Sequence, residues 1–180
     1  MRLFVAIDID DNIRSRIARF LDGVREFAPD VRWVRPESLH VTLKFIGEKS
    51  DDEVETIKRA LATIAADSFE LIFRGYGFFP GARAPRVFWI GSEGGSKLTS
   101  LAATVDETLA RGGGGSGSRR RNGGGRDHSF QRLQQKLAAL AAPEFGTMTA
   151  REFFLYRSKL SPSGSKYTKL AGFALRSEAK

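Results

Sequence analysis

The sequence predicts an α+β protein in which two similar lobes share one domain. Apolar residues alternate in short runs, they recur elsewhere at steps of three and four, and this order begins again after residue 85. Strands that alternate with helices form sheets covered by helices, and a groove between two lobes is a common place for a ligand. We therefore expect one bilobal domain over 1–180, with lobe one at about 1–75, lobe two at about 85–180 and sheets lining a central groove.

The first half of the chain predicts strand, helix, strand, helix and strand in that order. Residues 2–8 and 39–46 alternate as strands do, and Phe69 to Phe73 forms a third strand. Asp10 and Asp11 are suitable caps for the first helix, and Ser50 and Glu53 have the spacing of a capping box before the second. The apolar stripes of the two helices are Ile13, Ile17, Phe20, Leu21 and Val24, then Val54, Ile57, Leu61 and Ile64.

The second half begins to repeat this order but contains a glycine-rich interruption. We expect strands at 87–91, 152–156 and 170–175, and helical stripes at Leu98, Leu101, Val105 and Leu109 and, after Ser129, at Phe130, Leu133, Leu137 and Leu140. Equivalent lobes would require a strand between the two helices. Eight of the fifteen residues from 111 to 125 are glycine, which disfavours a strand. We predict a flexible basic loop at 111–128 and a second lobe that lacks one strand.

Composition narrows the class of protein. The chain has no cysteine and two histidines, so we expect no metal site and no cofactor. No apolar run approaches the roughly 20 residues that a membrane helix needs, and residues 1–8 do not suit a signal peptide. We expect a cytoplasmic, monomeric protein. Residues 1–110 hold 15 basic and 17 acidic side chains, whereas 111–180 hold 14 and 4. This charge favours nucleic acid as a partner, although a solvated charged loop fits equally well.

The sharpest local pattern is His40-Val41-Thr42 in the second predicted strand. Alternation places His40 and Thr42 on one face together with Lys44, and leaves Leu39, Val41, Leu43 and Phe45 on the other. An imidazole can move a proton near neutral pH, and a hydroxyl can donate to a phosphate oxygen. The pattern therefore suits phosphate chemistry, while a structural histidine on a strand face is an equally ordinary explanation.

The segment from Trp33 to Gly47 resembles the first motif of the 2H phosphoesterases, in their bacterial RNA 2',3'-cyclic phosphodiesterase (2'-5' RNA ligase-like) branch. Residues 1–7, 79–80, 85–87 and 156–162 together with Tyr167 resemble the same family. The resemblance implies a bilobal fold with two H-x-T motifs across a groove. It implies that His40 is the proton donor on a cyclic phosphate and that Thr42 binds the phosphate, with no metal.

The family's second motif, roughly P-H-L-T-L-A-R, is not evident in this chain. Thr108 and Arg111 match its end only if Asp106 replaces its histidine, and Leu109 continues a helical stripe, so the helix alignment is the better one. His128 is a further candidate for the missing imidazole, although it lacks the x-T partner. Phe4, Arg157 and Tyr167 are candidate substrate-binding residues; core packing for the aromatic rings and a surface charge for Arg157 are the alternatives.

Three functions follow from this pattern. The first is hydrolysis of RNA 2',3'-cyclic phosphate ends to a 2'-phosphate, impaired where the second histidine is missing. The second is an inactive protein of the same fold that binds RNA ends, and its affinity should fall as salt rises. The third is a damaged gene product whose second lobe is destabilised by the loss of a strand.

Overall fold

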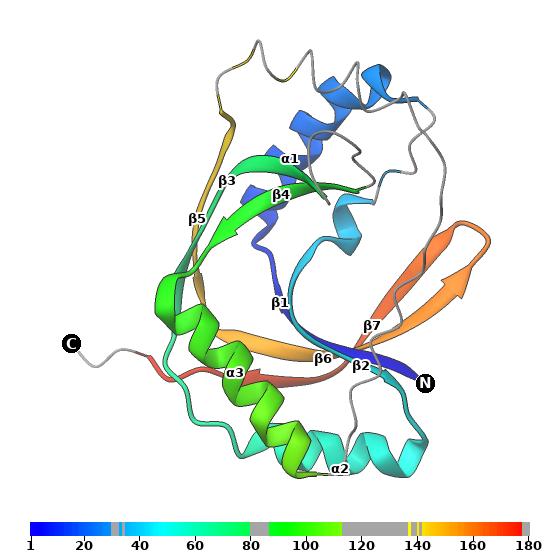
Figure 1. Ribbon diagram of the computed structural model, residues 1–180, viewed down its shortest axis with the longest axis vertical. Helices are drawn as coiled ribbons and strands as arrows, with labels where there is room; N and C mark the ends of the chain where they lie inside the picture. The colour runs from blue at the N-terminus through cyan, green and yellow to red at the C-terminus, as the bar shows by residue number, and fades with distance from the viewer. Residues whose placement is uncertain are drawn as a thin grey trace.

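The computed structural model describes residues 1–29, 33, 35–79, 87–112, 137, 140 and 142–177, and these residues form two antiparallel sheets (Figure 1). The four-stranded sheet has the order β2-β1-β6-β7, and the three-stranded sheet has the order β4-β3-β5. The α+β fold class is confirmed. The strands are β1 (Arg2–Asp8), β2 (His40–Glu48), β3 (Phe69–Phe79), β4 (Val87–Glu93), β5 (Glu144–Ala150), β6 (Glu152–Ser161) and β7 (Gly164–Ala174).

The α-helices of the described ranges form where the apolar stripes predict them: α1 (Asp11–Val24), α2 (Asp51–Ala62) and α3 (Gly95–Arg111). Each helix buries most of its stripe, while Phe20, Ile64 and Leu98 are partly buried and Ile64 lies just beyond the end of α2. The capping box of α2 is confirmed, because the Ser50 amide donates to Glu53 Oε2 at 2.7 Å and the Glu53 amide donates to Ser50 Oγ at 3.3 Å. Short 3₁₀ turns, η1 (Arg25–Phe27) and η2 (Pro36–Ser38), join α1 to β2. None of the described helices is long and apolar enough to cross a membrane.

The sheets combine strands from both halves of the chain. Strands β1 and β2 pair with β6 and β7, whereas β3 lies between β4 and β5. The predicted limits of about 1–75 and 85–180 therefore describe halves of the sequence and not separate sheets. Strand β5 was not predicted, and β6 and β7 extend well beyond 152–156 and 170–175. The loop 111–128 beyond Gly112 lies outside the described residues, as does the last predicted helix except Leu137, which is buried, and Leu140, which is exposed.

Strand β2 contains two β-bulges that correct the predicted alternation. The seven residues of β1 pair with seven of the nine residues of β2. Leu43 and Ile46 are therefore left without a partner in the ladder. Lys44 consequently pairs with Val5 of the core, and Phe45 pairs with Phe4. The predicted placement of Lys44 beside His40, and of Phe45 on the opposite face, is therefore wrong. The backbone of Gly47 has a φ of 95°, a conformation that glycine adopts without strain.

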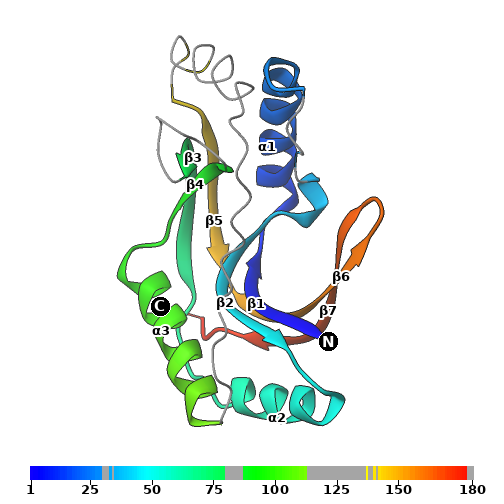
Figure 2. The same cartoon turned by 45° about the vertical axis from the view of Figure 1, so that its right-hand side comes forward.

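The core lies mainly between the sheets and the helices. Helix α1 packs against β5, and α3 packs against both α2 and β2, with α2 and α3 lying side by side (Figure 2). A second, smaller cluster of Phe4, Ala6 and Tyr156 lies apart from this core, with Phe154 and Tyr167 packed against it. Strands β1 and β2 thus separate two environments, and the H-x-T motif belongs to β2.

Candidate active site at the start of strand β2

His40 is the first residue of β2 and packs among aromatic rings. Its ring stacks on Phe4 with centroids 4.6 Å apart, meets the edge of Tyr167 at 5.2 Å and lies 6.1 Å from Tyr156. Phe4 and Tyr156 stack nearly in parallel at 5.0 Å. These rings come from β1, β6 and β7, so three strands of one sheet hold the imidazole in place.

One nitrogen of His40 is occupied by the protein. Nδ1 lies 2.8 Å from the carbonyl oxygen of Ser38. Because a carbonyl only accepts hydrogen bonds, Nδ1 carries the proton of this bond, and Nε2 is the nitrogen left to exchange a proton with a ligand. The last residue of η2 therefore fixes both the tautomer and the ring orientation of the neutral imidazole.

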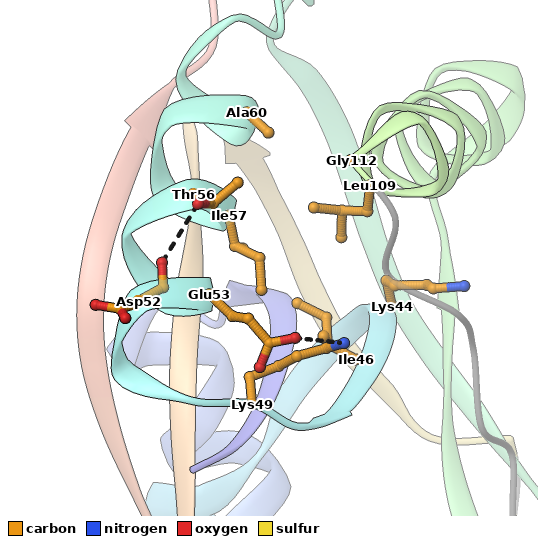
Figure 3. Close-up of a pocket in the computed structure, with 10 residues that line it drawn as sticks. All are labelled: Lys44, Ile46, Lys49, Asp52, Glu53, Thr56, Ile57, Ala60, Leu109 and Gly112. Carbon is orange, nitrogen blue, oxygen red and sulfur yellow. Dashed lines mark hydrogen bonds and ion pairs between the residues drawn. The ribbon is translucent and has the colours of Figure 1, made fainter.

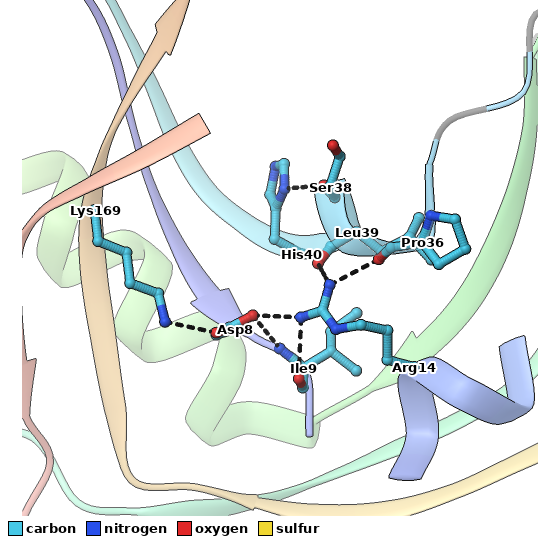
Figure 4. Close-up of polar contacts among 8 residues, drawn as sticks. All are labelled: Asp8, Ile9, Arg14, Pro36, Ser38, Leu39, His40 and Lys169. Carbon is cyan, nitrogen blue, oxygen red and sulfur yellow. Dashed lines mark hydrogen bonds and ion pairs between the residues drawn. The ribbon is translucent and has the colours of Figure 1, made fainter. Parts of the chain in front are cut away.

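Arg14 holds the turn that precedes His40 (Figure 4). Its Nη1 donates to the carbonyls of Pro36 at 2.7 Å and Leu39 at 3.3 Å, on either side of Ser38. Its Nη2 donates to Asp8 Oδ1 at 2.5 Å and to the carbonyl of Ile9 at 3.1 Å. One guanidinium from α1 thus ties the end of β1 to the start of β2, a geometry that its rigid fork of donors suits.

Asp8 links this turn to β7. Its Oδ1 also accepts from the amide of Ile9 at 2.9 Å, and its Oδ2 accepts from Lys169 Nζ at 2.7 Å. Burial alone would raise the pKa of Asp8, but the hydrogen bond and charge of Lys169 together with the charge of Arg14 hold this pKa below its ordinary value. Asp8 therefore remains a carboxylate between two cations.

Burial lowers the pKa of His40 below its ordinary value. The carbonyl of Ser38 and the charge of Asp8 oppose this shift, and the charge of Arg14 adds to it. The unliganded ring is consequently neutral at pH 7, with its Nε2 lone pair available. Burial raises the pKa of Tyr156 well above its usual range, so this phenol stays protonated.

Two clefts meet at His40. A cleft of about 670 Å³ extends from His40 past Phe4 and Phe45 to Arg2 and Glu48, with Ser158 and Ser165 along its side. A second cleft of about 580 Å³ contains the polar groups Asp8, Arg14 and Lys169. His40 and Tyr167 line both clefts, so the imidazole lies at the junction of an aromatic space and a charged one.

The predicted residues of the first half-site are brought together only in part. Thr42 follows His40 on the same face and pairs with Ala6 of the small cluster. Phe4 and Tyr167 surround His40, as described above. Arg157 pairs with Leu3, whose side chain is in the main core, so alternation along β6 turns Arg157 away from Tyr156. The structure does not bring Arg157 together with His40.

The candidates for the second half-site are Thr108, Arg111 and His128, and the structure describes only the first two. Thr108 and Arg111 lie in the last turn of α3, as the helix alignment predicts. Helix α3 packs on β2 through Lys44, which forms an ion pair with Asp106. His128 lies outside the described residues. The identity of a second proton-transfer group therefore stays a prediction.

A separate pocket of about 270 Å³ lies between α2, α3 and β2 (Figure 3). Lys44, Ile46, Ile57 and Leu109 line it, and it contains neither His40 nor Thr42. Among the residues that the structure describes, no group of three or more histidine, cysteine, aspartate or glutamate side chains could hold a metal ion.

Sequence reasoning did not identify the polar residues that hold His40. Asp8 is the last residue of an apolar strand, and Arg14 lies one turn into a helix, where an arginine ordinarily faces solvent. The one local sign of their interaction was that Asp8 and Arg14 carry opposite charges and lie six residues apart in the sequence. Their contacts with Pro36, Leu39 and Lys169 span 22 to 161 residues of sequence and cannot be predicted from local patterns.

Solved structures define the class of this protein as one with the LigT fold. A crystal structure from Thermus thermophilus matches 99% of this chain and 100% of its own length, with a TM-score of 0.75 and 27% identity. The crystal structure of Escherichia coli LigT complexed with 3'-AMP matches 97% of both chains, with a TM-score of 0.74 and 26% identity.

The sequence comparisons identify the family. The family model described as "LigT like Phosphoesterase" matches residues 7–89, which include His40 and Thr42. The RNA 2',3'-cyclic phosphodiesterase of Archaeoglobus fulgidus is 35% identical over 96% of this chain and 99% of its own length. That of Methanothermobacter thermautotrophicus is 31% identical over 97% and 99%. The chain belongs to the LigT-like branch of the 2H phosphoesterases.

Proposed function

We propose that the protein hydrolyses the 2',3'-cyclic phosphate end of RNA to a 2'-phosphate, with His40 as the proton donor. The observation that carries this proposal is the orientation of His40, whose Nδ1 is engaged by Ser38 while Nε2 is left for a ligand at the junction of two clefts. The curated relatives described above bear the name of this activity. The proposed reaction uses no metal ion or other cofactor.

In the proposed step, a water oxygen attacks phosphorus in line with the bond to the 3' oxygen. The new phosphorus–oxygen bond forms as the bond to the 3' oxygen breaks, and His40 Nε2–H transfers its proton to that oxygen. A second group accepts the proton lost by water. Thr42 donates to a non-bridging oxygen and stabilises the charge that develops there.

Substrate binding supplies the protonated form of His40 that this step requires. The free ring is neutral at pH 7 because burial lowers its pKa. An anionic cyclic phosphate beside Nε2 favours the imidazolium and raises this pKa again. The proton donor is therefore formed in the complex, so binding and protonation are coupled.

The acceptor of the water proton is assigned to the second half of the chain, where His128 is the candidate. The alternative function is binding of RNA ends without turnover. It is favoured by one observation, which is that the sequence contains no second H-x-T motif, since His128 is followed by Ser129 and Phe130. We also propose that the protein acts in the cytoplasm and as a monomer.

The test is hydrolysis of 2',3'-cyclic AMP by the purified full chain, followed by separation of 2'-AMP and 3'-AMP. We expect 2'-AMP as the product, and His40→Ala should lower kcat/KM by about 10²- to 10⁴-fold. His128→Asn tests the second group in the same assay. Turnover that His40→Ala leaves unchanged would contradict the proposal. Salt-sensitive RNA binding without turnover would establish the alternative instead.

A further inference from the structure

The hairpin formed by β6 and β7 carries positive charge without compensating acids. Residues 153–174 contain four basic side chains and no acidic one. One of the four, Lys169, is paired with Asp8 of the charged cleft. Lys159 and Lys166 are exposed, and neither forms an ion pair with any residue that the structure describes. The charges of these two lysines are therefore open to a ligand.

The two open lysines face each other across the hairpin. Lys159 and Lys166 are direct partners in the ladder between β6 and β7, so their side chains lie on the same face. Arg157 lies two residues before Lys159 and shares this face. Like charges in directly opposed positions repel and destabilise a strand pair. A bound polyanion would remove this repulsion, whereas the folded hairpin by itself gains nothing from it.

The part of the hairpin that carries these lysines projects beyond the sheet. Strand β1 pairs with β6 only as far as Ser158, so residues 159–161 and 164–166 pair only with each other in the described part of the chain. Figures 1 and 2 both show the hairpin extending away from the sheet. Leu160 is 67% exposed, nearly as open as Phe45 in the cleft at 71%. A large ligand can therefore approach this tip freely.

The tip lies next to the cleft of His40. Lys166 directly precedes Tyr167, whose ring meets the ring of His40 at 5.2 Å. Ser158 and Ser165 line the cleft, and each is the sequence neighbour of one of the two lysines. Alternation places the lysines on the face opposite to these serines. A chain that leaves the cleft past the serines thus crosses the edge of the hairpin and meets the two ammonium groups.

A hydrogen bond joins the hairpin turn to the segment that leads into His40. Arg35 Nη2 donates to the carbonyl oxygen of Ser163 at 3.3 Å, although the two residues are 128 positions apart. Arg35 directly precedes η2, the turn that contains Ser38. This contact holds the charged tip beside the half-site and leaves most donors of the exposed guanidinium for other partners.

Resting on the proposed function, we propose that this hairpin binds the sugar–phosphate backbone of the RNA strand upstream of the cyclic phosphate, with Lys159 and Lys166 as phosphate contacts. A lysine ammonium binds phosphate as a point charge and reads no base. The substrate class is therefore an RNA strand of several nucleotides, recognised beyond its end without regard to sequence. A mononucleotide fills only the cleft and gains nothing from the hairpin.

The experiment measures binding of an RNA of about eight nucleotides that ends in a 2'-phosphate, by fluorescence anisotropy with the full chain. The double variant Lys159→Gln, Lys166→Gln should bind this RNA about 5- to 30-fold more weakly at about 0.1 M salt. The slope of log affinity against log salt should become shallower by about 1.4, because each phosphate contact to a single strand contributes about 0.7. The affinity for 2'-AMP should change by less than about twofold.

A matched control removes the same charge from other exposed positions. The double variant Arg19→Gln, Arg151→Gln alters α1 and the junction of β5 with β6, and it should change RNA affinity by less than about twofold. The melting temperature of the lysine variant should not fall, because the variant relieves the repulsion between opposed charges. Weaker binding by that variant is then not a result of unfolding.

Equal RNA binding by the lysine variant and the unmodified chain would overturn the inference, as would the absence of RNA binding. Equal losses in the lysine and arginine variants would also overturn it, since net charge would then be the cause. If the lysine variant loses affinity for phosphatidylserine vesicles and not for RNA, the partner is an anionic membrane and the inference fails. If RNA binds through the lysines but 2',3'-cyclic AMP is not hydrolysed, the proposed function fails and the hairpin surface stands.

Discussion

The two sides of His40 hold the ring by different means. On one side, Asp8, Arg14 and Lys169 form charged hydrogen bonds, and these fix the turn that contains Ser38. On the other side, Phe4 supplies an apolar surface beneath the ring. The charged side sets the direction in which Nε2 points, whereas the aromatic side removes water and lowers the pKa of His40. The polar contacts orient the imidazole, and burial makes the largest contribution to its lowered pKa, to which the charges of Asp8 and Arg14 add smaller contributions of opposite sign. Variants on the two sides should therefore disturb orientation and pKa to different degrees.

The largest effect is expected from Phe4→Ala on the aromatic side. The side chain is 3% exposed and contacts four rings, so its removal leaves a cavity and should lower the free energy of unfolding by about 3–5 kcal/mol. Urea unfolding measures this loss. Phe45→Ala on the same face is the matched control and should change stability by no more than about 0.5 kcal/mol. Similar losses in the two variants would contradict the different burial of the two rings.

On the charged side, Arg14→Ala should lower the free energy of unfolding by about 1–3 kcal/mol, because it removes the donor of three carbonyls and one of the two cations that bind the Asp8 carboxylate. The turn at Ser38 should loosen, so kcat should fall more than KM rises. Arg19→Ala, an exposed arginine on the same helix, should change stability by at most about 0.5 kcal/mol. A normal kcat in Arg14→Ala would show that the turn holds its shape without the guanidinium.

A smaller effect is expected from Gly47→Ala, which tests the bulged end of β2. A side chain would meet no atom there within 4 Å, so the cost arises from the φ of 95° alone and should be about 1 kcal/mol. Thermal unfolding measures this cost. The matched control is Gly23→Ala in α1, where a side chain also meets nothing within 4 Å and φ is helical; this change should be neutral or stabilising. Equal destabilisation of the two variants would rule out backbone strain at Gly47.

The smallest effect is expected on the pH profile. The titratable groups that line the charged cleft with His40 are Asp8 on β1, Asp11 and Arg14 on α1, Glu37 in η2, Tyr156 on β6, and Tyr167 and Lys169 on β7. The carboxylate of Asp8 favours the imidazolium, so Asp8→Asn should lower the pKa of His40 further. If His40 donates a proton, the fall of kcat/KM at rising pH should move to lower pH. Asp22→Asn on α1 serves as the control and should leave the profile in place. Movement of the limb to higher pH would contradict the predicted electrostatics.

The same pKa shift predicts how stability varies with pH. The folded protein holds the pKa of His40 below its ordinary value of 6.5, so it disfavours the proton that the unfolded chain binds. This contribution to stability is present above pH 6.5 and is lost as pH falls through the folded pKa. His40→Gln should therefore flatten the acid side of the stability curve, as measured by urea unfolding at several pH values.

Much of the fold was predictable because local patterns determine it. The stripes of α1, α2 and α3 and the capping box at Ser50 depend on residues within a few positions of one another. Strand β5 was missed because Gly146 interrupts its alternation at the register shift opposite Phe73, so its buried residues follow no regular period of two. The outer parts of β6 and β7 were missed because they are polar and carry no apolar alternation.

The candidate site was predictable only at its most distinctive residues. His40 and Thr42 could be identified from the H-x-T pattern, and Phe4 and Tyr167 from the family resemblance. Lys44 and Phe45 were assigned to the wrong faces, since a bulge depends on the partner strand and not on β2 alone. The contacts of Arg14 with Pro36 and Leu39 depend on the tertiary fold and have no local signature.

The unequal lengths of β1 and β2 also shape the surface around His40. Nine residues are matched to seven, so β2 carries two surplus residues, or about 6–7 Å of extra contour. A longer strand paired with a shorter one must curve, and both strands sweep through a pronounced bend in Figure 1. Deleting Leu43 would leave Lys44 opposite Val5 and Phe45 opposite Phe4 while removing one source of this bend. The number of residues in β2 therefore affects the curvature of the surface around His40, whereas the pairing with β1 determines which side chains of β2 lie on that surface.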